Sequence, residues 1–189
     1  MAHFEHFENR SSTAPGKLLL TGAPGCGKTT LVQSLLAVIN RPAGGFTTQE
    51  IRQNGIRRGF EIVTLAGERG VLADVDFPGP FRIGRYGVSC EAVERLAVPA
   101  VIRAWQDGSL VVIDEIGPME MFSRLFCQAI EQILAGPAEV LGTIVLRSTP
   151  FGDRVKLMGG VELIEVTREN RGRLKNTLVQ RISDRKDNE

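Results

Sequence analysis

The chain has 189 residues, 42% of them hydrophobic, which predicts one domain, or at most two, with a sizeable core. Its 23 basic and 22 acidic side chains leave a net charge of +1, so no global basic field is available to hold nucleic acid or an anionic membrane. Three cysteines, Cys26, Cys90 and Cys127, are an odd number without metal-ligand spacing and favour reduced thiols. The apolar stretches are too short to cross a bilayer, so we expect a cytoplasmic protein without a membrane partner. We also expect it to be a monomer.

The two ends of the chain carry no regular hydrophobic period. Residues 1–15 lead into a Ser, Thr, Pro and Gly cluster, and we expect them to be a flexible tail. Their phenylalanines and histidines could dock on a partner, but an untethered terminus is the simpler interpretation. Residues 184–189 are charged and are expected to fray. We therefore predict a single domain over residues 16–183.

The first elements follow from the hydrophobic pattern. Residues 17–21 are a short apolar run, typical of a buried parallel strand, and residues 30–39 repeat apolar side chains at helical spacing. Residues 46–73 instead alternate polar and apolar side chains. Asn54-Gly55 and Ala66-Gly67 lie where hairpin turns would fall. This segment predicts antiparallel strands at one margin of the sheet.

The second half of the chain alternates helices and strands. Helical periods cover residues 91–106, 122–134 and 169–182, with a further helix expected after residue 146, and apolar strands fall within 109–120, at 140–146 and at 161–167. Such alternation predicts an α/β fold of three layers, with a mostly parallel central sheet, helices on both faces and an antiparallel β-rich insertion.

A phosphate-binding loop lies between the first strand and the first helix. Residues 22–29 (GAPGCGKT) match the pattern G-x-x-x-x-G-K-[ST] in full. Backbone N–H groups of such a loop surround phosphates, and the following helix presents its positive dipole end. Lys28 is expected to bridge the β- and γ-phosphates, and Thr29 to place its hydroxyl on Mg²⁺. The candidate nucleotide-binding residues are Gly22, Ala23, Pro24, Gly25, Cys26, Gly27, Lys28, Thr29 and Thr30.

Cys26 allows two interpretations. The helix N-terminus could lower the pKa of its thiol, or the residue could simply be a small filler of the loop. The filler interpretation is the more common one at such a position.

Acidic residues follow the buried strand within residues 109–120. Asp114 is expected where a central strand meets the phosphate loop, and its carboxylate would hold Mg²⁺ through water. Glu115 is a candidate to polarise an attacking water, with an ordinary surface carboxylate as the alternative. Glu120 is a weaker candidate for a supporting role.

Charge that develops on a transferred phosphoryl group calls for a further cation. Arginines are numerous enough to supply one within the chain, although each alone is better explained as a solvated surface residue. The sequence does not indicate which would act. The candidates are Arg52, Arg57, Arg58, Arg82, Arg85, Arg168 and Arg171.

Four further blocks follow the phosphate loop in order. They are residues 45–73 (GFTTQEIRQNGIRRGFEIVTLAGERGVLA), 82–101 (RIGRYGVSCEAVERLAVPAV), 112–123 (VIDEIGPMEMFS) and 166–171 (VTRENR). Together with the phosphate loop, they resemble a family of small P-loop nucleoside triphosphatases that includes thermophilic enzymes and the human cancer-related nucleoside triphosphatase. The resemblance covers nearly the whole chain after the first 15 residues.

This resemblance implies a P-loop NTPase fold and Mg²⁺-dependent hydrolysis of nucleoside 5'-triphosphates, with slow turnover and broad base tolerance. ATP and GTP are among the expected substrates, with Lys28 and Glu115 as catalytic residues. The chain departs from the family pattern at Pro118, where a lysine is usual, which removes a positive charge near the acidic pair.

Two other functions remain open at this point. Nucleotide and nucleoside kinases share the phosphate loop and the chain length, but an obvious second substrate site is not visible in the sequence. A nucleotide-controlled binding protein would use slow hydrolysis to reset an ordered loop. Near-zero net charge and 6% aromatic residues make nucleic acid an improbable partner.

Overall fold

The computed structural model describes residues 16–184. The tail expected at residues 1–15 and nearly all of the one expected at 184–189 lie outside the described residues. Across residues 16–184, no helix combines the length and the apolar character that a membrane span requires.

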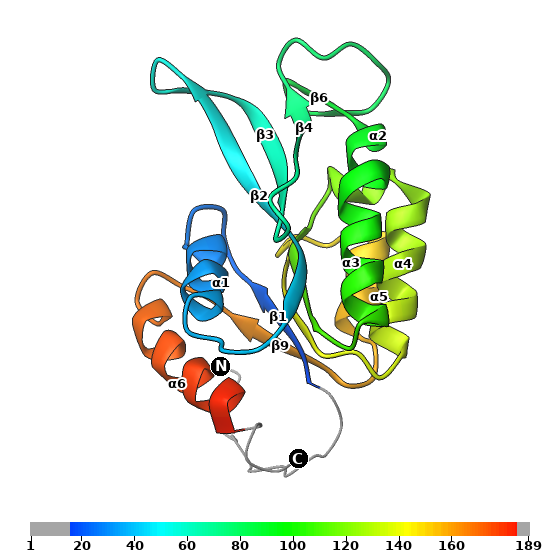
Figure 1. Cartoon of the computed structure of the whole chain (residues 1–189). Coiled ribbons are helices and arrows are strands. Elements are labelled where there is room, and N and C mark those ends of the chain that lie inside the picture. Colours follow the sequence, from blue (N-terminus) through cyan, green and yellow to red (C-terminus); the bar gives the residue numbers. More distant parts are fainter. Residues whose placement is uncertain (1–15, 185–189) are drawn as a thin grey trace.

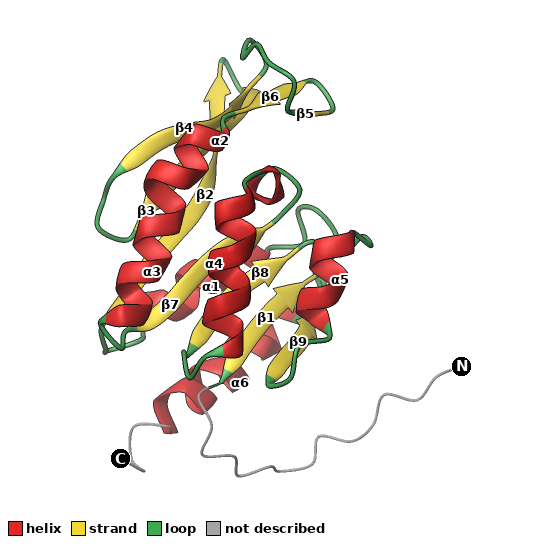
Figure 2. Ribbon diagram, turned by 90° about the vertical axis from the view of Figure 1, so that its right-hand side faces the viewer, coloured by secondary structure: helices red, strands yellow, loops and turns green. Residues whose placement is uncertain are grey.

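Within residues 16–184, one mixed sheet of nine strands forms the centre of the fold, in the order β5-β6-β4-β3-β2-β7-β8-β1-β9 (Figures 1 and 2). Strands β2, β7, β8, β1 and β9 run parallel, and the remaining pairings are antiparallel. Strand β8 therefore separates β1 from β7. The bounds are β1 (Lys17–Thr21), β2 (Ala43–Gln53), β3 (Ile56–Thr64), β4 (Arg69–Asp74), β5 (Arg82–Ile83), β6 (Tyr86–Val88), β7 (Leu110–Ile116), β8 (Val140–Ile144) and β9 (Val161–Glu165).

Helices cover both faces of the parallel strands, which confirms the three-layer α/β prediction. Helices α1 (Lys28–Leu36) and α6 (Arg171–Asp184) lie on one face, and α3 (Val98–Gln106), α4 (Arg124–Ala135) and α5 (Pro150–Lys156) lie on the other (Figures 1 and 2). Helix α2 (Cys90–Ala92), a π-helical turn (Val93–Ala97) and α3 follow one another without a break, so the helix expected at 91–106 is present with a local widening. A 3₁₀ turn (Glu120–Phe122) precedes α4.

Two apolar clusters hold the layers together, one on each face of the sheet. Adjacent residues of one strand enter different clusters: Leu19 joins the cluster under α3, α4 and α5, and Leu20 joins the cluster under α1 and α6. Strand β7 divides Val111 and Val112 in the same way. Because side chains alternate along a strand, a run that is apolar at every position indicates a strand buried on both faces.

The β-rich insertion extends from one margin of the sheet, as predicted. Asn54 and Gly55 connect β2 to β3 with φ angles of 51° and 77°, the left-handed pair that a tight hairpin requires. The sequence interpretation needs one correction, because β2 starts at Ala43 and its first residues, through Thr47, pair in parallel with β7. The insertion is thus the continuation of a central strand. The short strands β5 and β6 were not predicted.

Candidate active site

The phosphate loop connects β1 to α1 at the carboxyl edge of the parallel strands. Gly22, Gly25 and Gly27 have φ angles of 148°, 73° and 105°, a backbone region that disfavours other residues. A β-carbon on Gly22 would lie 2.3 Å from the carbonyl oxygen of Val166, so the loop packs closely on the segment after β9. Lys28 Nζ donates a hydrogen bond to the Gly22 carbonyl at 3.1 Å, which bends the lysine back over the loop.

Cys26 fills space beneath this loop. Its side chain is 5% exposed and belongs to the apolar cluster that also contains Leu31 and Val166. This packing favours the filler interpretation. Cys26, Cys90 and Cys127 are all free thiols.

Asp114 lies near the end of β7, fully buried, and reaches the phosphate loop. Its Oδ1 accepts hydrogen bonds from the Thr29 hydroxyl at 3.3 Å and from the Thr143 hydroxyl at 2.5 Å. Its Oδ2 is buried and has no hydrogen-bond partner within residues 16–184. Burial raises the pKa of Asp114, and the two hydroxyls and the positive charge of Lys28 partly offset this rise.

The residues present fit a magnesium ion. A buried carboxylate oxygen without a partner costs free energy unless a donor or a cation engages it, and the Thr29 hydroxyl lies on the same carboxylate. Residues 16–184 hold no cluster of three or more His, Cys, Asp or Glu side chains arranged as metal ligands. Mg²⁺ keeps several waters and binds proteins through one or two carboxylates together with substrate phosphates, so this sparse donor set suits it.

Glu115 and Glu120 approach each other across Gly117. The position that a β-carbon would take on Gly117 lies 2.8 Å from Glu120 Oε2 and 3.2 Å from Glu115 Oε1. Burial raises the pKa of both carboxyls, and the Glu115 charge adds to the effect on Glu120, whose pKa rises to about 8. The charge of Lys28 acts against the rise at Glu115. The two groups therefore form a poorly hydrated acidic pair beside Asp114.

Two features of this site exceed what the sequence indicated. Glu120 is 4% exposed and lies directly beside Glu115, although the sequence made it a weak candidate. Thr143 on β8 was not considered, because it lies inside an apolar run and is separated from Asp114 by 29 residues. A polar residue at a central position of a buried strand was the available signal.

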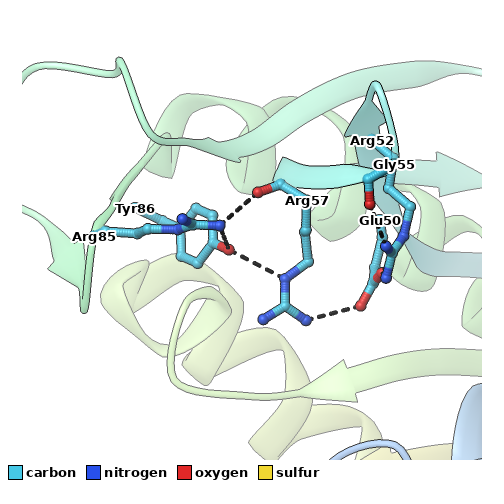
Figure 3. Close-up of polar contacts among 6 residues, drawn as sticks. All are labelled: Glu50, Arg52, Gly55, Arg57, Arg85 and Tyr86. Carbon is cyan, nitrogen blue, oxygen red and sulfur yellow. Dashed lines mark hydrogen bonds and ion pairs between the residues drawn. The ribbon is translucent and has the colours of Figure 1, made fainter.

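Most of the candidate arginines are engaged within the β-rich insertion. Figure 3 shows Arg57 extended between Glu50 and the hydroxyl of Tyr86, with Nη1 and Nε donating at 2.8 and 3.1 Å. Arg85 donates to the same Tyr86 hydroxyl and to the Arg57 carbonyl, and Arg52 pairs with Glu50. The hydrogen bonds that Arg57 and Arg85 donate to the Tyr86 hydroxyl lower the pKa of Tyr86.

The other candidate arginines separate into two groups. Arg58 pairs with Asp74 and Asp76, and Arg82 donates to the backbone carbonyls of Phe77 and Arg85. Arg168 and Arg171 lie after β9, both exposed. The guanidinium of Arg171 touches the phosphate loop, since a β-carbon on Gly27 would meet its Nη1 at 2.9 Å.

This geometry agrees with comparisons to known proteins. A family model described as NTPase matches residues 17–179. The chain belongs to this NTPase family. A THEP1 nucleoside-triphosphatase from Thermotoga sp. (strain RQ2) is 42% identical over 163 residues, which are 86% of this chain and 93% of that protein. The human cancer-related nucleoside-triphosphatase is 40% identical over 178 residues, covering 86% of this chain and 94% of its own.

Solved structures of NTPase family members share the fold. The crystal structure of THEP1 from Aquifex aeolicus has a TM-score of 0.80 at 34% identity and covers 88% of this chain and 98% of its own. The solution structure of the human cancer-related nucleoside triphosphatase has a TM-score of 0.76 at 37% identity, covering 90% and 98%. The resemblance drawn from the sequence blocks is confirmed.

Proposed function

We propose that this chain hydrolyses nucleoside 5'-triphosphates, ATP and GTP among them, to the diphosphate and phosphate with the help of Mg²⁺. The observation that carries the proposal is the contact of Thr29 with Asp114, which brings the phosphate loop and the acidic end of β7 into one site. The names of the relatives, nucleoside-triphosphatases from bacteria and from human, support the same reaction.

The phosphate loop holds the substrate. Backbone N–H groups of residues 22–30, apart from Pro24, surround the β- and γ-phosphates, and the N-terminus of α1 adds its dipole. Lys28 exchanges its hydrogen bond to the Gly22 carbonyl for phosphate oxygens. Its charge then follows the negative charge that moves onto the β–γ bridging oxygen as that bond breaks.

Thr29 and Asp114 would hold the metal ion, with the Asp114 Oδ2 atom as the vacant acceptor. Bound there, Mg²⁺ supplies neutralisation of charge on the phosphate oxygens. Thr143 keeps Oδ1 engaged and so fixes the orientation of the carboxylate.

Glu115 positions the attacking water and accepts its proton. Strand β8 lies between β1 and β7, so the acidic end of β7 is two strand spacings, about 10 Å, from the strand that carries the loop. This separation leaves room for a water between Glu115 and the γ-phosphate. A carboxylate whose pKa is raised by burial is a better base than an exposed one. The new oxygen–phosphorus bond forms as the bridging bond breaks.

A phosphate-release assay tests the proposal. Purified protein is incubated with ATP, GTP, CTP or UTP, with and without Mg²⁺ and without any acceptor molecule. We expect release from each triphosphate that needs Mg²⁺ and is lost in Lys28→Ala, while Lys175→Ala, an exposed lysine of α6, keeps wild-type activity. Release that appears only with an added acceptor would favour a kinase, and wild-type turnover in folded Lys28→Ala would reject this loop as the catalytic site.

A further inference from the structure

Arg171 is the first residue of α6, and its side chain lies against the phosphate loop. The position of a β-carbon on Gly27 would be 2.9 Å from Arg171 Nη1 and 3.2 Å from its Cδ. Gly27 directly precedes Lys28, so the guanidinium lies beside the residues that bind phosphate. Within residues 16–184, no hydrogen bond or ion pair engages this guanidinium, and the side chain is exposed. It is a cation held at the loop and available for a ligand.

The segment before Arg171 is held in a fixed conformation. Thr167 N donates to Asn170 Oδ1 at 2.8 Å, and Asn170 N donates to Thr167 Oγ1 at 3.2 Å. Asn170 Nδ2 donates to the Glu165 carbonyl, and Val166 N donates to the Thr21 carbonyl at 2.7 Å. This network ties the start of α6 to the end of β1. The backbone of Arg171 is therefore positioned relative to the phosphate loop before any ligand arrives.

The order of strands indicates which end of a triphosphate Arg171 faces. Asp114 and Glu115 lie on β7, beyond β8 on one side of β1, whereas Arg171 follows β9 on the other side. In the proposed reaction the γ-phosphate lies on the side of Asp114, which would hold the metal ion, and of Glu115, which would activate the water. A triphosphate seated on the loop therefore extends its nucleoside toward β9 and α6. This position separates Arg171 from the reacting phosphate.

The chemistry of the same segment indicates how the nucleoside is contacted. The side-chain amide of Asn170 accepts one backbone hydrogen bond at its oxygen and donates one at its nitrogen, so its orientation is set by the backbone. A planar guanidinium stacks on the face of an aromatic ring, and every base has such a face. Arg171 offers this plane at the nucleoside end of the loop.

We propose that Arg171 binds the nucleoside by stacking its guanidinium on the base. The inference rests on the proposed function, because it takes a nucleotide to be the ligand of the loop. Arg171 is then a binding residue that sets affinity for nucleotides over plain polyphosphate and takes no part in the chemical step.

Calorimetric titration of the whole protein in Mg²⁺ tests this role with two probes, a non-hydrolysable ATP analogue and inorganic tripolyphosphate. Tripolyphosphate fills the phosphate positions but has no base. We expect Arg171→Ala to weaken binding of the ATP analogue by about tenfold and to leave tripolyphosphate binding unchanged. Arg171→Lys keeps the charge but loses the plane, so it should weaken the analogue as well. Arg173→Ala removes an exposed arginine two residues further along α6 and should change neither affinity.

Other outcomes would overturn the inference. Equal weakening of both probes would make Arg171 a phosphate ligand, and a fall in kcat at unchanged KM for ATP would make it a group that acts on the γ-phosphate. Wild-type affinity of Arg171→Ala for both probes would leave the proposed function intact and reject the stacking role alone. If the wild-type protein binds neither probe, the proposed function itself fails, and the role of Arg171 fails with it.

Discussion

The hydroxyl of Thr143 on β8 donates a hydrogen bond of 2.5 Å to Oδ1 of Asp114 on the neighbouring strand β7. Both residues are fully buried. The bond joins two adjacent strands near the carboxyl end of β7. The same oxygen of Asp114 also accepts a hydrogen bond from Thr29 of the phosphate loop. Thr143 thus fixes the carboxylate of Asp114, the proposed metal ligand, to strand β8.

Replacing Thr143 with valine tests this positioning role. Thr143→Val keeps the shape and removes the donor, so Asp114 Oδ1 is left with Thr29 as its partner. We expect the Mg²⁺ concentration for half-maximal phosphate release to rise by about 10-fold or more, as for other residues that orient a metal ligand. Thr21→Val is the matched control, because the buried Thr21 hydroxyl donates to the Ile144 carbonyl instead. An equal shift in both variants would mean that the effect is general loosening of the sheet.

The exchange of Glu115 for glutamine separates binding from chemistry. Glu115→Gln keeps the size and hydrogen-bonding ability but loses the charge that draws a proton from water. Turnover should fall by roughly 10²–10⁴-fold, the usual cost of losing a general base. Nucleotide affinity measured by calorimetry should stay within about tenfold of wild type, because the loop, Lys28 and Asp114 are unchanged. Loss of affinity together with turnover would place Glu115 in the metal site, and undiminished turnover would assign water activation to another group.

Glu120 gives a stability prediction that depends on pH. Its pKa rises to about 8 in the folded protein, from 4.5 as the ordinary value, because burial and the Glu115 charge disfavour ionisation. Its contribution to stability is therefore complete below about pH 4.5 and is lost as pH rises toward 8, with a slope of about 1.4 kcal/mol per pH unit for one proton. The side chain of Glu120→Gln stays neutral at every pH. As pH rises from about 4.5 to 8, the free energy of unfolding of the variant should therefore increase relative to that of wild type.

Denaturant titrations at several pH values measure this difference. Glu50→Gln is a control of opposite sign, because hydrogen bonds from Arg57 and Arg52 lower the pKa of Glu50. Its favourable contribution is present above about pH 4.5 and is lost as pH falls. A difference between Glu120→Gln and wild type that does not vary from pH 5 to 8 would contradict a raised pKa at Glu120.

The close approach of β2 and β7 gives a fourth prediction. Gly45 has a φ of 113°, and a β-carbon there would lie 2.0 Å from the carbonyl oxygen of Val112. Gly45→Ala should therefore cost several kcal/mol of the free energy of unfolding, through backbone strain and overlap. Gly159→Ala is the matched control, because its β-carbon would meet no atom within 4 Å. If Gly45→Ala, like Gly159→Ala, changes the free energy of unfolding by less than about 0.5 kcal/mol, the result would contradict the close approach of β2 and β7 at Gly45.

Local patterns predicted the elements well, because their causes are local. The glycine-rich loop, the apolar run before it and the helical period after it lie within about 20 residues, and Asn54-Gly55 specifies its own turn. Asp114 was placed for a similar reason, at the end of an apolar strand. The helix expected from residue 169 starts two residues later, at Arg171, because Thr167 and Asn170 cap it through each other's side chains.

What the sequence did not predict depends on strand order. The parallel start of β2 beside β7, the hydroxyl of Thr143 beside Asp114 and the approach of Arg171 to Gly27 each join segments at least 29 residues apart. Glu120 lies near Glu115 in sequence, but its burial depends on how the 3₁₀ turn packs. Hydrophobic periodicity shows which face of a helix or strand is apolar, but it does not show which other helix or strand packs against that face.

Strand β1 is synthesised first but acquires its neighbours last. Its two partners are β8 (Val140–Ile144) and β9 (Val161–Glu165), and β7 reaches it only through β8. A nascent chain that ends before Val140 has neither neighbour of β1, so the strand that leads into its phosphate loop cannot yet join the sheet that holds Asp114. We therefore expect the proposed nucleotide site to form only after most of the chain has emerged from the ribosome, and contacts of such long sequence separation also slow folding.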